Sequence, residues 1–351
     1  MSRGSRRPRA PEGADLPRPG LSEGLWPIGG TGHELDVVGL GENSLDRLNR
    51  IQAWPAAGQK QEILESTVCP GGQVASAMLG CARLGLRSAY IGAVGADAAG
   101  DGVLVPLREA GIDLSGVQRI PGAATRQAQI LIRDGDGERS VLAQTDPDLR
   151  VALDRLDRRS VQKARLLHVD TSDLEASLWA AGVARDAGVP VVLDADHPVD
   201  GIEKLLGRVD FPVVSESFTR AWAEGDSPAA GLEKLTHWGG RLAVVTCGAD
   251  GARAAFGPHR IHAPAFSGEV RDTTGAGDAF HAGLIWAILK GYGAREALDA
   301  ANAVASFSCA ALGAQAGLPS QTQLREFLAR PQSGPRGAMP VDEDEDEERH
   351  G

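Results

Sequence analysis

Short apolar runs that alternate with helically spaced apolar residues constrain the fold of this 351-residue chain more than any other feature. Strand-like runs lie at 35–41, 89–94, 166–169, 189–193 and 242–246, and several segments between them carry apolar residues three or four positions apart. Strands that are linked through helices pair in parallel, with the helices on both faces of the sheet. We therefore expect an α/β fold of three layers, α-β-α, with a mostly parallel central sheet.

Residues 125–145 depart from this alternation. Apolar side chains at every second position from Ala128 share one face, and a turn of Asp and Gly residues at 134–137 sends the chain back. This pattern predicts a hairpin with one covered face. We expect the hairpin, together with about 47–69, to form a small β-sheet lid. Arg139 would direct its charge from the lid towards a ligand, and a solvated surface arginine is the alternative.

The two ends of the chain differ in composition from its middle. Residues 1–33 hold five Arg and three acids among repeated Pro and Gly, and residues 331–351 hold seven acids and two Arg. Neither end shows apolar periodicity, so both are expected to be disordered tails around one domain at 34–330. The tails carry charges of +2 and −5 out of a net −11, which leaves −8 on the domain. This acidic balance argues against nucleic acid as a partner.

The sequence also indicates the cellular compartment in which the protein is expected. Its longest apolar runs fall short of the roughly 18 residues that span a membrane. The Arg-rich start lacks the apolar run of a secretion signal, and its prolines oppose an amphipathic targeting helix. The four cysteines, Cys69, Cys81, Cys247 and Cys309, are scattered without metal-ligand spacing. We expect reduced core thiols, no zinc site, no membrane partner and a cytoplasmic protein.

The stretch 270–290 carries the clearest chemistry. It reads Asp-Thr-Thr-Gly-Ala-Gly-Asp from Asp272 to Asp278 and continues with helical spacing of apolar residues. A Gly-Ala-Gly turn that runs into a helix points free backbone N–H groups at an anion, at the positive end of the helix dipole. A carboxylate beside a bound phosphate is unfavourable unless it accepts a proton, so Asp278 is a predicted general base. A helix-capping aspartate in an ordinary tight turn is the alternative.

Two further polar groups are placed where open α/β sheets bind ligands. Residues 42–46 follow the first strand and end at Asp46, and Gly-Gly-Gln at 71–73 precedes a helix. Paired glycines let a ligand approach the backbone, and Gln73 supplies a donor and acceptors, although a simple loop-to-helix turn is the alternative. A dinucleotide fingerprint would need glycine where Ser44 stands, which disfavours an NAD-dependent oxidoreductase.

In combination and in order, these motifs resemble those of the ribokinase-like sugar kinases, also called the PfkB family, over about 35–330. The most specific match is 272–278 followed by Ala-Gly-Leu-Ile at 282–285. Supporting matches lie at 71–72, 92–97, 137–140, 246–248 and 313–315. The resemblance implies a ribokinase-like fold and transfer of the ATP γ-phosphoryl group to a sugar-type hydroxyl. It also implies ATP and Mg²⁺ as cofactors, with a monovalent cation as a further candidate.

The resemblance implies a role for each matching residue. Asp278 is the base, and the backbone of Gly275, Ala276, Gly277 and Asp278 forms an anion hole for the transferred phosphoryl group. Substrate contacts are implied for Asp46, Gly71, Gly72, Gln73, Ser76 and Arg139. Nucleotide contacts are implied for Thr246, Gly248, Gly251, Thr274, Asn302 and Ser306. Closure of the lid would exclude water, which competes as a phosphoryl acceptor.

The sequence departs from the family pattern at two places. Ser76 stands where the family has Asn, and the Asn-x-x-Glu metal motif falls on Ser-Glu-Ser-Phe at 215–218. Glu216 is the candidate metal residue, since Mg²⁺ can be held through water by few carboxylates, and a plain exposed glutamate is the alternative. These departures favour a second hypothesis, a catalytically silent sugar- or nucleotide-binding protein.

The substrate stays open at this point. A free sugar, a sugar phosphate and a nucleoside are all compatible with the family pattern, so a nucleoside kinase is a further alternative. The resemblance tilts the interpretation towards a free sugar. It also leads us to expect a homodimer that pairs through the lid.

Overall fold

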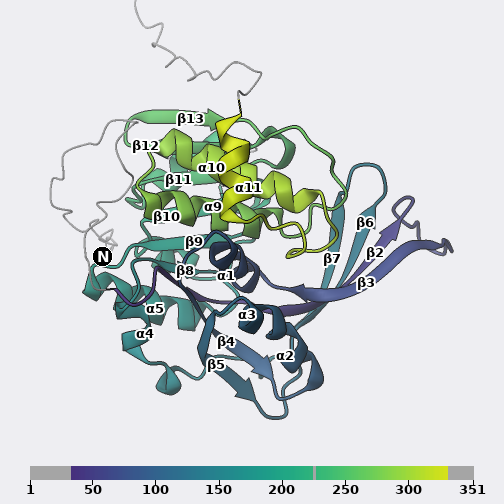
Figure 1. The fold of residues 1–351 in the computed structure, drawn as a ribbon, viewed down its shortest axis with the longest axis horizontal. Helices are drawn as coiled ribbons and strands as arrows, with labels where there is room; N and C mark the ends of the chain where they lie inside the picture. Colours follow the sequence, from purple (N-terminus) through teal and green to yellow (C-terminus); the bar gives the residue numbers. More distant parts are fainter. Residues whose placement is uncertain (1–32, 224–226, 331–351) are drawn as a thin grey trace, which may run out of the picture.

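The computed structural model describes residues 33–223 and 227–330, which are coloured in Figure 1. The predicted disordered tails, 1–33 and 331–351, lie outside the described residues, apart from His33 itself. Within these two ranges, no helix combines the length and the apolarity that crossing a membrane requires.

A nine-stranded sheet forms the centre of the described chain, in the order β13-β12-β11-β10-β9-β8-β1-β4-β5. Neighbouring strands from β11 to β5 pair in parallel, and β12 and β13 add an antiparallel edge. The expectation of a mostly parallel central sheet is confirmed. The strands are β1 Val37–Leu40, β4 Ser88–Gly95, β5 Asp113–Ile120, β8 Leu167–Val169, β9 Val191–Ala195, β10 Phe211–Ser215, β11 Ala243–Thr246, β12 Ala252–Phe256 and β13 His259–Ala263.

Helices cover both faces of this sheet, which gives the expected three layers (Figure 1). One hydrophobic core joins the sheet to α1, α3, α9, α10 and α11, and a second core joins it to α4 through α8. The helices are α1 Gln73–Arg83, α2 Ala98–Val103, α3 Val105–Glu109, α4 Arg158–Gln162, α5 Leu174–Ala187, α6 Ile202–Leu206, α7 Glu216–Trp222, α8 Pro228–Thr236, α9 Ala276–Lys290, α10 Ala294–Cys309 and α11 Gln321–Ala329.

A second, four-stranded sheet in the order β3-β2-β6-β7 projects from the side of the body as the predicted lid (Figure 1). Its strands are β2 Ser44–Ile51, β3 Ile63–Gly71, β6 Gln127–Arg133 and β7 Arg139–Gln144. Alternate side chains from Leu48, Ala128, Ile130 and Ile132 are buried against Leu312, which explains the period-two pattern. Because β2 begins shortly after β1 ends, the lid rises from the carboxyl edge of the central sheet.

Helix α9 lies in the middle of its layer, and its residues from Ala279 to Leu289 are all buried. Two glycines allow its neighbours to approach. A Cβ on Gly80 of α1 would lie 2.6 Å from the Cβ of Ala282, and a Cβ on Gly283 would lie 2.8 Å from the Cα of Ala301 in α10. This close packing on two sides fixes the position of the turn at the start of α9.

Between β4 and β5 the chain forms two short helices, α2 and α3, with Pro106 in the first turn of α3. Strands β5 and β13 lie outside the strand-like runs of the sequence. Both are edge strands whose exposed and buried side chains are mixed, so neither contains an apolar run.

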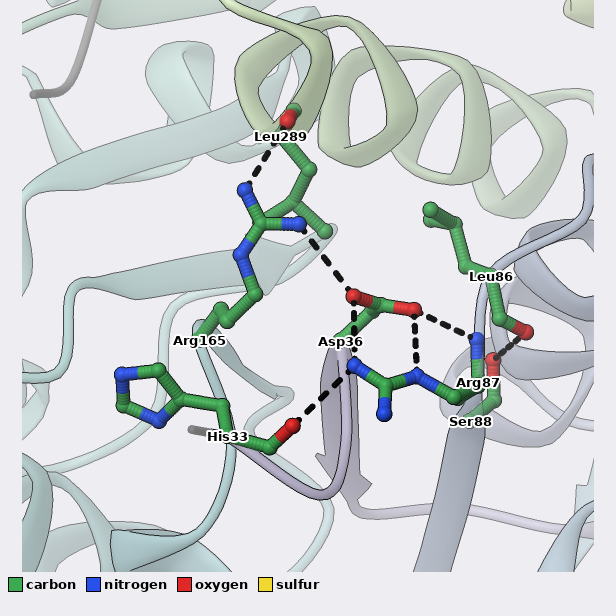
Figure 2. Close-up of polar contacts among 7 residues, drawn as sticks. All are labelled: His33, Asp36, Leu86, Arg87, Ser88, Arg165 and Leu289. Atoms are coloured by element: carbon green, nitrogen blue, oxygen red, sulfur yellow. Dashed lines mark hydrogen bonds and ion pairs between the residues drawn. The ribbon is translucent and has the colours of Figure 1, made fainter. Parts of the chain in front are cut away.

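A charged cluster lies at the amino end of β1 and β4 in the central sheet (Figure 2). The carboxylate of Asp36, just before β1, accepts hydrogen bonds from Arg87 Nε at 3.1 Å and from Arg165 Nη1 at 3.2 Å. Arg165 also donates to the carbonyl of Leu289 near the end of α9, at 3.1 Å. Burial raises the pKa of Asp36, but the hydrogen bonds from the two arginines outweigh burial and lower it to about 2. The cluster therefore joins β1, β4 and α9.

Candidate active site

The turn that begins α9 presents two free backbone donors. Gly275 precedes the helix with φ of 77°, and a Cβ at this position would lie 2.4 Å from the Cα of Ala314, so only glycine fits. The N–H of Ala276 donates to Thr273 O at 3.2 Å. The N–H groups of Gly277 and Asp278 find no carbonyl partner in the described parts of the chain. The space around Gly277 is open, so an anion can approach these donors.

Asp272 holds this turn against the loop that follows α10. Its side chain is fully buried, and its two oxygens accept hydrogen bonds from the N–H of Thr274 at 2.8 Å and of Gly313 at 2.7 Å. Both oxygens are therefore used inside the protein. Of the two carboxylates in the motif, Asp272 shapes the turn and Asp278 is available for chemistry.

Asp278 is partly exposed, and the pKa of its carboxyl group is raised. Loss of hydration raises its pKa, the charge of Arg139 lowers it, and the nearby carboxylates of Asp46, Asp196 and Asp170 raise it again, to about 7. A carboxyl group with a pKa near neutrality both accepts and releases a proton readily at neutral pH. The same charges show that Asp46 and Arg139 lie near Asp278.

The lid is docked directly on the loop that leads into α9. Arg139 Nη1 donates to the carbonyl oxygen of Thr273 at 2.8 Å and to its hydroxyl at 3.1 Å. In return, the N–H and hydroxyl of Thr273 donate to Gly137 O at 3.1 and 2.8 Å. The lid turn and the catalytic turn are thus joined through one residue, and Arg139 both docks the lid and adds positive charge beside Asp278.

Of the predicted substrate residues, Asp46 and Arg139 lie near enough to Asp278 to act on its pKa. Asp46 is buried on β2, where loss of hydration raises its pKa. A Cβ on Gly71 would lie 1.9 Å from an oxygen of Asp46, so the glycine leaves room for that carboxylate. Gly72 caps the start of α1, and Gln73 is the first, partly exposed residue of this helix.

Ser76 is used inside the protein. It is fully buried on α1, and its hydroxyl accepts a hydrogen bond from Gln315 Nε2 at 3.3 Å. This contact fixes the 313–315 loop, which also donates a hydrogen bond from the N–H of Gly313 to Asp272. A role of Ser76 towards a sugar stays a prediction.

Four further polar residues lie at this end of the site. Glu42 and Asn43 belong to the segment 42–46 that was expected at this edge of the sheet, whereas Arg126 and Asp170 were not predicted. Glu42 forms an ion pair with Arg126, and its N–H donates to Asp170 at 2.7 Å. Asn43 is 3% exposed, yet its amide makes no hydrogen bond of good geometry to the described residues. The available signal for Asp170 was position, since it directly follows strand β8.

The predicted phosphate and ribose contacts lie at the end of β11. The Thr246 hydroxyl donates to Val214 O at 3.4 Å, in the neighbouring strand β10. Gly248 faces open space in the short turn that follows, whereas a Cβ on Gly251 would lie 2.2 Å from Ala263 O. Gly248 is accessible to a ligand, and Gly251 is required for packing.

The other predicted nucleotide residues differ in what they offer. Thr274 is buried, and its hydroxyl has no partner within the described ranges. Asn302 donates to Ala263 O at 2.9 Å and to Pro264 O at 3.2 Å, so it holds the loop after β13. Ser306 donates to a carbonyl of its own helix at 2.8 Å. Contacts of these side chains with adenine stay predictions.

Glu216 begins α7 at the carboxyl end of β10, and its carboxylate binds Arg220 at 2.7 Å. No group of three or more His, Cys, Asp or Glu side chains in the described chain is arranged to hold a metal ion. Mg²⁺ keeps most of its water and needs only one or two carboxylates, so Glu216 fits such a role. Glu216 lines a cavity of about 330 Å³ together with Ser227, Pro228, Ala229, Cys247, Asp250 and Arg253.

A parallel sheet with a lid over its carboxyl edge, an anion-binding helix start and a carboxylate of pKa near 7 are the features of a ribokinase-like phosphotransferase. Residues 34–321 match the family described as pfkB family carbohydrate kinase, and the chain belongs to this family. The expectation of an ATP-dependent carbohydrate kinase is confirmed.

Individual relatives agree with this membership. The chain is 29% identical over 300 residues to the ATP-dependent ribose-1-phosphate kinase of Halopiger xanaduensis, which covers 84% of this chain and 98% of the relative. It is 24% identical over 295 residues to the ribokinase of Bacillus subtilis, with 84% and 99% covered.

Solved structures share the fold. The ribokinase of Thermotoga maritima superposes with a TM-score of 0.72 at 22% identity and covers 84% of this chain and all of that structure. The ribokinase of Arabidopsis thaliana gives a TM-score of 0.70 at 23% identity, with 85% and 99% covered. The predicted ribokinase-like fold is therefore confirmed.

Proposed function

We propose that this protein transfers the γ-phosphoryl group of ATP to a hydroxyl of a free, uncharged sugar, with Asp278 as the base. One observation carries the proposal. Asp278 has a pKa of about 7 and lies in the same helical turn as two free backbone N–H groups. A proton acceptor and an anion site are thus combined at one point, as phosphoryl transfer to a hydroxyl requires.

The residues divide the reaction between them. Asp278 accepts the proton of the sugar hydroxyl. At the same time, the oxygen of that hydroxyl bonds to the γ-phosphorus, and the bond between the γ-phosphorus and the ADP oxygen breaks. The N–H groups of Gly277 and Asp278 donate to the phosphoryl oxygens as charge develops on them. Arg139, held on Thr273, keeps the lid over the site and excludes competing water. Asp278 then releases its proton to solvent.

The charges around Asp46 favour a neutral substrate. Glu42, Asp46 and Asp170 are three carboxyl groups at this end of the site. Burial raises the pKa of each, that of Glu42 to about 8, and the one arginine among them, Arg126, is already paired with Glu42. Carboxyl groups exchange hydrogen bonds with sugar hydroxyls, whereas a phosphate group would find no unpaired positive charge among these four residues. The proposed acceptor is therefore a free sugar rather than a sugar phosphate.

ATP is proposed as the donor because the chain is a pfkB family carbohydrate kinase and because the ribose-1-phosphate kinase relative is described as ATP-dependent. Mg²⁺ bound with the nucleotide would neutralise phosphate charge, and Glu216 is the residue proposed to hold it through water. Dependence on a monovalent cation stays a prediction, which turnover in potassium and in tetramethylammonium salts would check.

Release of ADP by the purified protein tests the proposed function. ATP and Mg²⁺ are supplied with matched acceptors: ribose and ribose 5-phosphate, fructose and fructose 6-phosphate, and a panel of nucleosides. Release above the acceptor-free rate with at least one free sugar supports the proposal. Release with phosphorylated sugars alone would contradict the neutral acceptor, and release with nucleosides alone would make the protein a nucleoside kinase. No release with any acceptor, while sugar or ATP still binds, would favour a silent binding protein.

We also propose that two copies pair through their lids in the cytoplasm. The edge strands of the lid, β3 and β7, expose large apolar side chains, including Ile63 at 52% and Leu142 at 63%. Leu64, Val68 and Val141 extend this surface along the same strands. Light scattering should give twice the monomer mass, and Leu142→Glu should halve it; a monomeric wild type would contradict the dimer.

All four cysteines are free, which supports the proposed location in the reducing cytoplasm.

A further inference from the structure

His281 lies one helical turn after Asp278, on the buried side of α9. The residue is 2% exposed, and Nδ1 lies 2.8 Å from the carbonyl oxygen of Gly277. A carbonyl oxygen only accepts hydrogen bonds, so Nδ1 carries the proton and donates it. Burial lowers the pKa of His281 to about 4, against the opposing effect of the Gly277 and Leu193 backbones, so the ring is neutral at neutral pH.

The acceptor of this hydrogen bond has a special position. The carbonyl of Gly277 and the N–H of Asp278 belong to the same peptide unit, and this N–H is one of the two free donors at the start of α9. A hydrogen bond donated to a peptide carbonyl draws electrons towards its oxygen and makes the N–H of that unit a stronger donor. It also fixes the plane of the peptide, and with it the direction of the N–H.

Two buried side chains lie beside His281. Asp194 Oδ2, at the end of β9, lies 3.4 Å from the same Nδ1, and His168 of β8 lies with its ring centre 5.2 Å from that of His281. Asp194 Oδ2, His281 Nε2 and both nitrogens of His168 make no hydrogen bond of good geometry within the described chain. Apolar side chains would fill this space without that cost, so packing alone does not account for the histidine at position 281.

We propose that His281 is a positioning residue for phosphoryl transfer: through Nδ1 it orients and polarises the Gly277–Asp278 peptide, whose N–H stabilises the transferred phosphoryl group. Asp194 Oδ2 lies beside the same nitrogen, at 3.4 Å. The inference rests on the proposed function, because it assigns an anion-hole role to the Asp278 N–H.

Amide side chains separate this role from simple packing. In His281→Asn the amide nitrogen takes the place of Nδ1 and still reaches the Gly277 carbonyl, whereas in His281→Gln it takes the place of Nε2 and does not. His281→Leu keeps the volume and removes the donor. Removal of a whole anion-hole donor costs about 10²–10³ in kcat. We expect about a tenfold loss of kcat in the Gln and Leu variants, since their donor is weakened rather than removed, with the KM of sugar and of ATP nearly unchanged. The Asn variant should stay within about threefold of wild type.

Binding of a phosphoryl mimic provides a second measurement that does not depend on turnover. Aluminium fluoride, bound together with ADP, Mg²⁺ and sugar, mimics the phosphoryl group in the transition state of its transfer. Its affinity should fall about tenfold in the Gln and Leu variants and stay near wild type in the Asn variant, while ATP binding is unchanged. His168→Leu is the matched control, because it alters the same buried layer without contact to Gly277, and it should keep wild-type kcat.

Equal kcat and equal mimic affinity in the Asn, Gln and Leu variants would overturn the inference. This holds whether all three resemble wild type or all three are equally impaired, because either pattern would mean that the Nδ1 donor is irrelevant. These outcomes are distinct from failure of the proposed function, in which the wild type itself releases no ADP with any acceptor.

Discussion

The charge of Arg139 should set the pH range in which the enzyme works. Asp278 has a pKa of about 7, so about half of it is ionised at pH 7, and Arg139 is the charge that lowers this pKa. A neighbouring opposite charge typically lowers a carboxyl pKa by one to three units. In Arg139→Gln we therefore expect the pKa of Asp278 to rise by about one unit, which reduces the ionised fraction at pH 7 from about a half to about a tenth.

The assay is kcat/KM for the sugar at saturating ATP, measured from pH 5.5 to 9.5, because this ratio reports the pKa of the base before the sugar binds. The base must be ionised, so activity is lost as pH falls through its pKa. We expect the acid limb of the profile to move up by about one unit and kcat/KM at pH 7 to fall about fivefold, with recovery above pH 9. ATP affinity should change little.

Arg139 also docks the lid on Thr273, and this second effect does not depend on pH. A loss that remains at high pH measures lid docking, and the part that is recovered measures the charge. Arg260→Gln on β13 is the control for a change in net charge, since Arg260 pairs with exposed Glu233. An unmoved acid limb in Arg139→Gln, with activity reduced equally at all pH values, would refute the electrostatic role.

Three further changes test other parts of the structure. Asp36→Asn should lower the free energy of unfolding, measured by urea denaturation, by about 1 kcal/mol at pH 7 and by almost nothing at pH 2. The effect is small because partial exposure screens the ion pairs of Asp36. The sign follows from the lowered pKa: this stability is complete above pH 3.8 and is lost as pH falls through about 2, so an equal loss at both pH values would contradict it. Gly275→Ala should destabilise the fold by about 2–4 kcal/mol, because it combines a positive φ with a clash against Ala314; an unchanged denaturation midpoint would be inconsistent with this geometry. Asp46→Ala should raise the KM of the sugar at least about tenfold without changing ATP affinity, and equal weakening of both would remove Asp46 from the sugar site.

The parts of the fold that the sequence predicts are those whose burial is complete. Strands β1, β8, β9 and β11 are buried on both faces, so they appear as continuous apolar runs. The edge strands β5 and β13 are partly exposed to solvent and contain no such run. They were recognised only in the structure, from their pairing with β4 and β12. Period-two alternation revealed the lid, because only one face of its inner strands is covered.

The site also contains residues that the sequence predicts and residues that only the tertiary structure brings together. Asp278 and the turn before it are local in sequence, so the Gly-Ala-Gly-Asp motif was sufficient to find them. Glu42, Asp170, Asp194 and His281 come from four separate elements and meet only because the strand order places β1, β8 and β9 side by side under α9. Their assembly depends on tertiary structure, and no spacing along the chain encodes it.

The role of Asp278 as the base is the central claim, and Asp278→Asn tests it most directly. The substitution keeps the size and hydrogen bonding of the side chain and removes its ability to accept the proton. ATP binding, measured by calorimetry, should be preserved, while sugar-dependent ADP release should fall by at least about 10². If Asp278→Asn folds, binds ATP and keeps most of its turnover, Asp278 is not the base.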